Sequence, residues 1–239
     1  MTCGKKILIV LAAALAVVGP AYAITGGTPD GQGHPAVGLL LADAGPAGFQ
    51  PDCSGALVAP DVFVTAAHCF IGTASNRVLV TFDAQATPTS KFVQGIAYPD
   101  PAFNMDKKDL HDLAVVKLVS PVAGVTPLAL PQAGVVDSKA LRSAQLTNVG
   151  YGYFDRTFVF DGVRRVSISN VTNAKDTELR LAEHPGGVCF GDSGGPRLLG
   201  STILAVTSTG NKNCTGQSLN YRLDTPSARA FLSQFVAVP

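Results

Sequence analysis

Three short clusters of the chain combine residue types that can carry out nucleophilic chemistry. VTAAHCF places His68 after an apolar run, HDLAVVKL places Asp112 at the start of another, and VCFGDSGGPRLL places Ser193 between an aspartate and two glycines. A serine hydroxyl becomes a useful nucleophile only beside a base, an imidazole can take its proton, and a carboxylate can orient that imidazole. The order His, Asp, Ser therefore suggests a catalytic triad.

Each cluster alone is also compatible with a structural role. A single histidine beside a strand is usually a core or surface residue, an aspartate at a strand start is usually a turn residue, and a serine among glycines is usually part of a loop. The six residues GDSGGP around Ser193 make the combination far more specific than its parts.

The first 23 residues have the pattern of a signal peptide. Lys5 and Lys6 precede the apolar run 7–18, and Ala21-Tyr22-Ala23 follows as an A-x-A pattern of small residues. The alternative is a membrane anchor, but a spanning helix needs roughly 20 apolar residues and this run is shorter. We therefore expect segment 1–23 to be removed and the mature chain to begin at Ile24.

The cysteine count favours disulfides. Of the five cysteines, Cys3 lies in the signal segment, which leaves Cys53, Cys69, Cys189 and Cys214. An even number in an oxidising compartment suggests two disulfides, and four cysteines allow three pairings. A zinc site is the alternative, but no C-x-x-C spacing supports it.

Composition and patterning indicate a packed all-β protein. The chain has 239 residues, 46% of them hydrophobic, and a formal net charge of +1, which argues against disorder and against nucleic-acid binding. Short apolar stretches separated by Gly, Pro, Asn and Asp predict many strands in a barrel or sandwich. The predicted strands fall within 36–43, 54–68, 77–84, 92–99, 113–118, 144–152, 158–169, 178–182, 197–210 and 219–224. Segment 224–239 predicts a helix capped by Thr225, and the Pro-rich segment 120–137 predicts a linker between two halves.

Taken together, these segments resemble the chymotrypsin-like (trypsin-fold) secreted serine endopeptidases over nearly the whole mature chain. The resemblance is carried by ITGG, CSGALVAPDVFVTAAHC, DLHDLAVVKL, NVGYG, VCFGDSGGP, AVTSTG and NYRLDTPSARAFL. It implies an all-β fold of two six-stranded antiparallel β-barrels with a C-terminal helix. The expected halves are 24–130 and 131–239, which together form one peptidase domain with the triad in the crevice between them.

The resemblance also assigns catalytic roles. His68 would be the general base, Asp112 would orient it, and Ser193 would be the nucleophile. The backbone N–H groups of Gly191 and Ser193 would form the oxyanion hole. Ser208 would border the substrate and hydrogen-bond Asp112.

Further family features concern the disulfides and activation. The implied pairs are Cys53–Cys69 and Cys189–Cys214. The freed α-amino group of Ile24 would pair with Asp192, which lies in an otherwise apolar loop and has no obvious Lys or Arg nearby in the sequence.

The expected specificity pocket departs from the trypsin pattern. Its base would be Gly187, where trypsin-like members carry an acid, so a preference for Lys or Arg has no basis in the sequence. Val188, Gly210 and Ser218 would complete an apolar pocket, together with Ser208. We therefore expect a large apolar or aromatic residue before the scissile bond.

The resemblance implies a secreted (extracellular or periplasmic) endopeptidase that acts on protein or peptide substrates. We expect a monomer with no metal, no cofactor, no nucleic acid and no membrane contact after signal removal. One alternative is a binding protein that has lost its chemistry on the same fold. The other is an esterase, because GDSGG loosely matches G-x-S-x-G, although the triad order and the all-β pattern argue against an α/β-hydrolase.

Overall fold

The structure is a computed structural model that describes residues 24, 26–153, 159–183 and 187–239. The predicted signal segment 1–23 lies outside the described residues. Within the described part of the chain, no helix is long and apolar enough to cross a membrane.

The first barrel is built from strands that follow one another closely in the sequence. It closes in the order β2-β3-β4-β7-β6-β5, with every neighbouring pair antiparallel. The strands are β2 (Val37–Asp43), β3 (Phe49–Ala59), β4 (Val62–Thr65), β5 (Ser75–Thr81), β6 (Val93–Pro99) and β7 (Ala114–Leu118). Their buried side chains, among them Leu40, Leu57, Phe63, Val80 and Val116, form one apolar core.

The second barrel follows the Pro-rich segment. Its strands are β8 (Gln145–Gly150), β9 (Arg165–Lys175), β10 (Glu178–Glu183), β11 (Pro196–Leu199), β12 (Thr202–Thr209) and β13 (Gly216–Arg222). They run in the order β9-β10-β13-β12-β11-β8, and pairing of β8 with β9 closes the ring. The short strand β1 (Thr28–Pro29) adds to the outer side of β9. The prediction of two six-stranded antiparallel barrels is confirmed.

The C-terminal helix is shorter than the sequence predicted. α1 spans Pro226–Leu232, and the Thr225 hydroxyl accepts the N–H of Ala228 as expected of an N-cap. The remaining residues to position 239 are not α-helical; Phe235, Val236 and Val238 instead pack against the apolar core. Elsewhere in the described residues, 3₁₀ turns occur at Gly45–Ala47, Ala67–Phe70, Val135–Asp137 and Lys139–Ser143.

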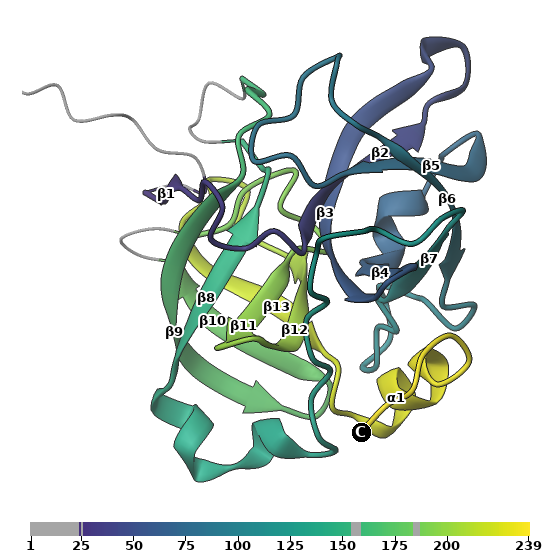
Figure 1. The fold of residues 1–239 in the computed structure, drawn as a ribbon. Coiled ribbons are helices and arrows are strands. Elements are labelled where there is room, and N and C mark those ends of the chain that lie inside the picture. Colours follow the sequence, from purple (N-terminus) through teal and green to yellow (C-terminus); the bar gives the residue numbers. More distant parts are fainter. Residues whose placement is uncertain (1–23, 25, 154–158, 184–186) are drawn as a thin grey trace, which may run out of the picture.

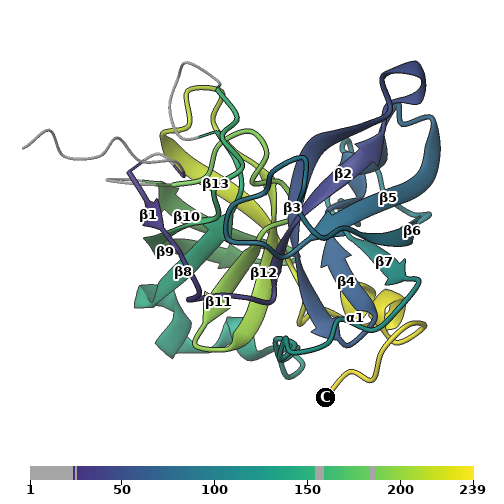
Figure 2. The ribbon, with the colours of Figure 1, turned by 45° about the horizontal axis from the view of Figure 1, so that its top comes forward.

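Each end of the described chain lies against the barrel formed by the other half of the chain: β1 against the second barrel, and α1 with the tail after it against the first (Figure 1). Figure 1 shows the barrels side by side, with β1 on the outer edge of the second barrel and α1 beneath the first. Figure 2 gives the same arrangement from another angle. The rings of Tyr98 on β6 and Phe235 after α1 lie 5.3 Å apart, which fixes the C-terminal tail on the first barrel.

Arg164 ties the barrels together from a fully buried position. Its Nη1 donates to the carbonyls of Val37 (3.1 Å) and Phe82 (2.9 Å) and to the Tyr151 hydroxyl, and its Nε donates to Asp30 (2.8 Å). A buried cation is tolerated when it is paired and its donors are satisfied. The partners come from the N-terminal segment and from both barrels, so this cluster fixes the relative position of the two halves that form the cleft.

Candidate active site

Asp112 holds His68 at two points. His68 lies in the 3₁₀ turn that follows β4, and Asp112 lies just before β7, which pairs with β4. Asp112 Oδ1 accepts the backbone N–H of His68 at 2.9 Å, and Oδ2 lies 2.8 Å from the ring Nδ1. The Ser208 hydroxyl donates to the same Oδ2. Because the buried carboxylate occupies the Nδ1 side, a neutral ring leaves Nε2 free to accept a proton.

The backbone before Asp112 adopts a conformation that is unusual for a side-chain-bearing residue. His111 has φ +50° and is held in place by a 2.9 Å contact between its Nδ1 and Asp100 Oδ2. Its carbonyl accepts the N–H of Leu113 at 2.8 Å. Non-glycine residues with positive φ persist where the surroundings hold them, and they cluster at functional sites. This tight turn directs the Asp112 side chain into the interior, where it meets His68.

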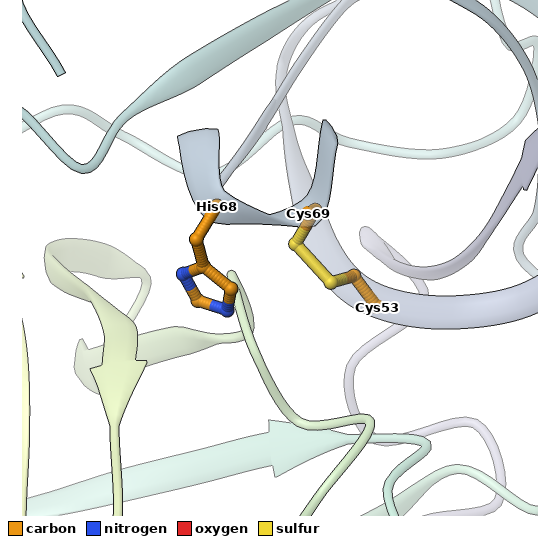
Figure 3. A group of neighbouring side chains, drawn as sticks. All are labelled: Cys53, His68 and Cys69. Atoms are coloured by element: carbon orange, nitrogen blue, oxygen red, sulfur yellow. A yellow bond between two sulfur atoms is a disulfide. The ribbon is translucent and has the colours of Figure 1, made fainter. Parts of the chain in front are cut away.

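A disulfide clamps the histidine turn. Figure 3 shows His68 and Cys69 on the same short turn, with Cys69 bonded to Cys53. The ligand atoms of these three residues lie within 4.8 Å of one another, a spacing that could suit a metal ion. The two sulfur atoms are bonded to each other, however, so neither can act as a thiolate ligand. The second disulfide joins Cys189 to Cys214, and both pairings are those implied by the family resemblance.

The loop that carries Ser193 leaves two backbone donors open. Neighbouring N–H groups are used within the fold: that of Asp192 donates to the Cys189 carbonyl (3.1 Å) and that of Gly194 to the Thr207 carbonyl (2.8 Å). Among the described residues, the structure shows no acceptor for the N–H groups of Gly191 and Ser193. Gly191 has φ +90°, which a residue with a Cβ rarely adopts. Two open N–H donors on one loop, separated by a single residue, form a site suited to a developing negative charge.

Gly194 offers a stability test of this loop. It has φ +75°, and a Cβ there would lie 2.0 Å from Thr65 Oγ1 and 2.6 Å from the Ser54 carbonyl oxygen. Gly200 has φ +60° but no atom within 4 Å of such a Cβ. We expect Gly200→Ala to lower the free energy of unfolding by about 1–2 kcal/mol through backbone strain alone. Gly194→Ala should lower it by about 3–5 kcal/mol, because overpacking adds to the strain. Urea denaturation measures both, and equal losses would contradict the packing argument.

Asp192 is a fully buried carboxylate in the loop that carries Ser193. Its Oδ1 accepts the N–H of Gly152 at 2.8 Å, and its Oδ2 accepts the N–H of Cys189 at 2.9 Å. Burial raises its pKa to about 7, against the lowering effect of these hydrogen bonds. A Cβ at Gly150 or Gly152 would lie 2.2 or 2.4 Å from the Asp192 side chain, so the glycines of NVGYG leave room for the carboxylate.

Sequence reasoning missed one cation near Asp192. Arg197 follows it by five residues and is fully buried, and its positive charge acts to lower the pKa of Asp192. The available signal was an arginine directly after GDSGGP. The residues on either side of it in the strand Pro196–Leu199 are buried. The expectation of no nearby cation was therefore wrong, although the guanidinium of Arg197 forms its ion pair with Glu183, as described below. The other member of the predicted activation pair, Ile24, is buried.

His68 and Ser193 line one cleft of about 1000 Å³. Three of the predicted pocket residues, Val188, Ser208 and Gly210, also line it, and Gly187 and Ser218 do not. Ser218 lines an adjoining hollow of about 470 Å³, which shares Thr209, Gly210 and Asn211 with the cleft. Exposed apolar side chains contribute to the cleft lining, namely Ile71, Met105, Phe160 and Phe190.

The sequence model of the family described as Trypsin matches residues 24–231. The chain belongs to the trypsin family of serine proteases. It is 28% identical over 182 residues to the venom plasminogen activator Haly-PA of Gloydius brevicauda, covering 68% of each chain. It is 31% identical over 193 residues to the renal glandular kallikrein of Mastomys natalensis, covering 68% of this chain and 71% of the kallikrein.

The fold of this trypsin-family chain is similar to solved structures that share little sequence with it. A structure named "HL collagenase" superposes with a TM-score of 0.74 at 20% identity, covering 88% of this chain and 97% of that one. A structure named "GrC" gives a TM-score of 0.72, also at 20% identity. At this level of identity, the similarity concerns the fold alone.

The surroundings of Gly187 in this trypsin-family chain differ from those expected from the sequence. The sequence indicated that no acid lies at the base, because position 187 is glycine. In the structure, a Cβ at Gly187 would lie 1.9 Å from Oε2 of Glu183, so a carboxylate from β10 fills the space beside it. Sequence reasoning missed Glu183 because it searched for the acid at one position along the chain. A glutamate closing the apolar strand ELRLAE was the only available signal.

Proposed function

We propose that this protein is a secreted serine endopeptidase that hydrolyses peptide bonds through His68, Asp112 and Ser193. The observation that carries the proposal is the double hold of Asp112 on His68, through the backbone N–H and the ring Nδ1, in the cleft that Ser193 also lines. An oriented imidazole in the same cleft as a serine, whose loop has two open backbone donors, is the arrangement needed for acyl transfer.

In this mechanism, the Ser193 hydroxyl attacks the carbonyl carbon of the scissile bond while His68 Nε2 takes its proton. The resulting imidazolium is stabilised by Asp112, which keeps its own negative charge. The negatively charged oxygen of the tetrahedral intermediate accepts hydrogen bonds from the N–H groups of Gly191 and Ser193. His68 then protonates the leaving amine, which leaves an acyl-enzyme. Water, activated by the same imidazole, releases the acid product and restores Ser193.

We further propose that the residue before the scissile bond is apolar or aromatic. The first supporting observation is the set of apolar side chains in the cleft lining. The second is Gly210 in the same lining, because it has no side chain to narrow the cleft. Val188, Ser208 and Ser218 would be the other pocket residues, and Gly187 would lie at the base.

We propose secretion (extracellular or periplasmic) with removal of residues 1–23, a monomeric state, and Ile24 paired with Asp192 after cleavage. Two disulfides are consistent with an oxidising compartment. The family match begins at Ile24, directly after the A-x-A pattern.

Two assays on separate samples test the proposed function: labelling with a fluorophosphonate, and hydrolysis of peptide bonds by the unlabelled protein. We expect stoichiometric labelling of Ser193 and cleavage of internal peptide bonds in an unstructured protein such as casein. Absence of labelling in the processed chain would favour the binding-protein alternative. Labelling with hydrolysis of ester substrates but not of peptide bonds would favour the esterase.

Profiling on a peptide library tests the specificity. We expect Phe, Tyr, Leu or Met before the cleaved bond in most products. A dominant preference for Lys, Arg, Asp or Glu at that position would contradict the proposed pocket while leaving the proposed catalytic mechanism intact.

A further inference from the structure

A buried carboxylate from β10 lies directly behind the proposed specificity pocket, although Glu183 itself does not line the cleft. Glu183 ends β10, and its side chain is only 2% exposed. A Cβ at Gly187 would lie 1.9 Å from Glu183 Oε2 and 2.3 Å from its Cβ. The Glu183 side chain therefore occupies the space that a side chain at position 187 would take.

Both oxygens of the Glu183 carboxylate accept hydrogen bonds. Oε2 accepts the backbone N–H of Val188 at 3.1 Å and the Ser169 hydroxyl at 3.2 Å. Oε1 accepts the Ser218 hydroxyl, and it accepts Nη2 of Arg197 at 3.2 Å. Since Val188 itself lines the cleft, the carboxylate is bonded directly to the pocket wall.

The cation of this pair lies behind the carboxylate. Arg197 on β11 is fully buried and does not line the cleft. Its Nη2 also donates to Ser218 Oγ at 3.0 Å, and its Nε donates to the side chain of Asn220. Burial lowers the pKa of the guanidinium, and the negative charge of Glu183 is the first of the effects that oppose this lowering.

We propose that the Glu183–Arg197 ion pair sets the charge of the specificity pocket. Glu183 supplies a carboxylate behind the pocket wall at Val188, Arg197 neutralises it from within the barrel, and the pocket therefore accepts uncharged side chains. The proposal rests on the peptidase activity proposed above, and it names the residues that determine the substrate class of that site.

A charged substrate side chain in the pocket would interact with both buried charges, those of Glu183 and Arg197. A substrate cation would be attracted by Glu183 but repelled by Arg197 close behind it, and these opposing energies largely cancel because each falls only as the inverse of distance. For a substrate anion both energies change sign, so they largely cancel as well. Either charged side chain would also lose its hydration without a partner, whereas an uncharged one would not.

A purely structural role for the ion pair makes a different prediction. If the pair only stabilises the barrel, removing its cation changes stability but not the charge that the pocket prefers. If the pair sets the pocket charge, removing the cation leaves a carboxylate that favours a basic substrate side chain. Replacing both members by uncharged residues of similar size is often tolerated by the fold, which provides a matched control.

The test compares Arg197→Met with the double variant Glu183→Gln/Arg197→Met. Matched peptide amides carry Lys or Met before the scissile bond, and assays run at pH 9, because an unpaired buried carboxyl can stay neutral up to about pH 8–9. We expect Arg197→Met to raise the Lys-to-Met ratio of kcat/KM at least about tenfold over the wild type. The double variant should stay within about threefold of the wild type, since neither charge remains.

Measurements on the wild type keep the proposal testable if Arg197→Met does not fold. Benzamidinium and neutral benzamide have nearly the same shape, so we expect their inhibition constants to agree within about threefold. A preference for benzamidinium above about tenfold would overturn the proposal, because it would show an uncompensated carboxylate. An unchanged Lys-to-Met ratio in folded Arg197→Met would overturn it as well. Titration with diisopropyl fluorophosphate counts active sites independently of pocket charge, so a wild type that is not labelled would instead contradict the proposed peptidase function.

Discussion

Replacing Ser193 with alanine is expected to lower kcat by a factor on the order of 10⁶ while leaving the fold intact. The hydroxyl oxygen is the atom that attacks in the proposed mechanism, so alanine removes the nucleophile itself. The Ser193 carbonyl accepts the N–H of Ser54 at 2.8 Å, a backbone bond that alanine retains. Initial rates on a peptide substrate measure the activity, and urea denaturation checks that stability is unchanged.

His68→Ala and the double variant provide the control for this prediction. Members of a triad act as a unit, so His68→Ala alone should be about as severe as Ser193→Ala, and the double variant should be no worse than either. Losses that multiply would indicate that the two residues act in separate steps. More than a few per cent of activity left in either single variant would show that the triad assignment is wrong.

The strands and the local clusters could be predicted from the sequence because their signals are short-range, whereas the two-barrel arrangement was expected only from the family resemblance. The apolar run before His68, the glycines around Ser193 and the alternation within the strands are each visible within about ten residues. The pairing of Asp112 with His68 spans 44 residues, and composition or periodicity alone could not establish it. It was expected only because the segments resemble a family in which the two meet.

The surroundings of Gly187 could not be predicted from the sequence. Residue 187 was considered in isolation, but the space beside it is determined by β10 and β11, which the sequence does not place relative to the pocket. Glu183 and Arg197 meet there across the barrel, at a sequence separation of 14. Their buried contact depends on barrel closure and strand register, for which the sequence alone contained no signal.

Retaining residues ahead of Ile24 is expected to leave a folded but nearly inactive chain. In the uncleaved chain the Ile24 nitrogen is a peptide nitrogen, so it cannot serve as the cation that the buried Asp192 requires. After cleavage, the freed ammonium can pair with Asp192 and hold the neighbouring Gly191 and Ser193 N–H groups in their open arrangement. Removing one partner of a buried pair costs about 3–5 kcal/mol, so Asp192→Asn in the processed chain should be nearly inactive as well. Turnover of a peptide substrate by processed, unprocessed and Asp192→Asn forms measures this.

The pH dependence of stability separates this mechanism from a general effect of the extra residues. Without the ammonium, burial raises the pKa of Asp192 from 3.8 to about 7. A raised pKa gives stability that is fully present below the unfolded value and is lost as pH rises through the folded value. The unprocessed chain should therefore lose roughly 3 kcal/mol between pH 4 and pH 7 relative to unprocessed Asp192→Asn.

In the processed chain the ion pair reverses this trend. Pairing lowers the pKa of the Asp192 carboxyl and raises that of the amine above its unfolded value of about 7.7–8.0. The contribution of the amine is then present below that value and is lost only as pH rises through its folded pKa. The processed chain should thus stay stable at pH 7, where the unprocessed chain has already lost stability relative to Asp192→Asn. Urea denaturation of both forms from pH 4 to pH 9, each paired with its Asp192→Asn variant, measures the difference. Full activity of a chain that retains residues ahead of Ile24, or identical difference profiles for the two forms, would refute the Ile24–Asp192 switch.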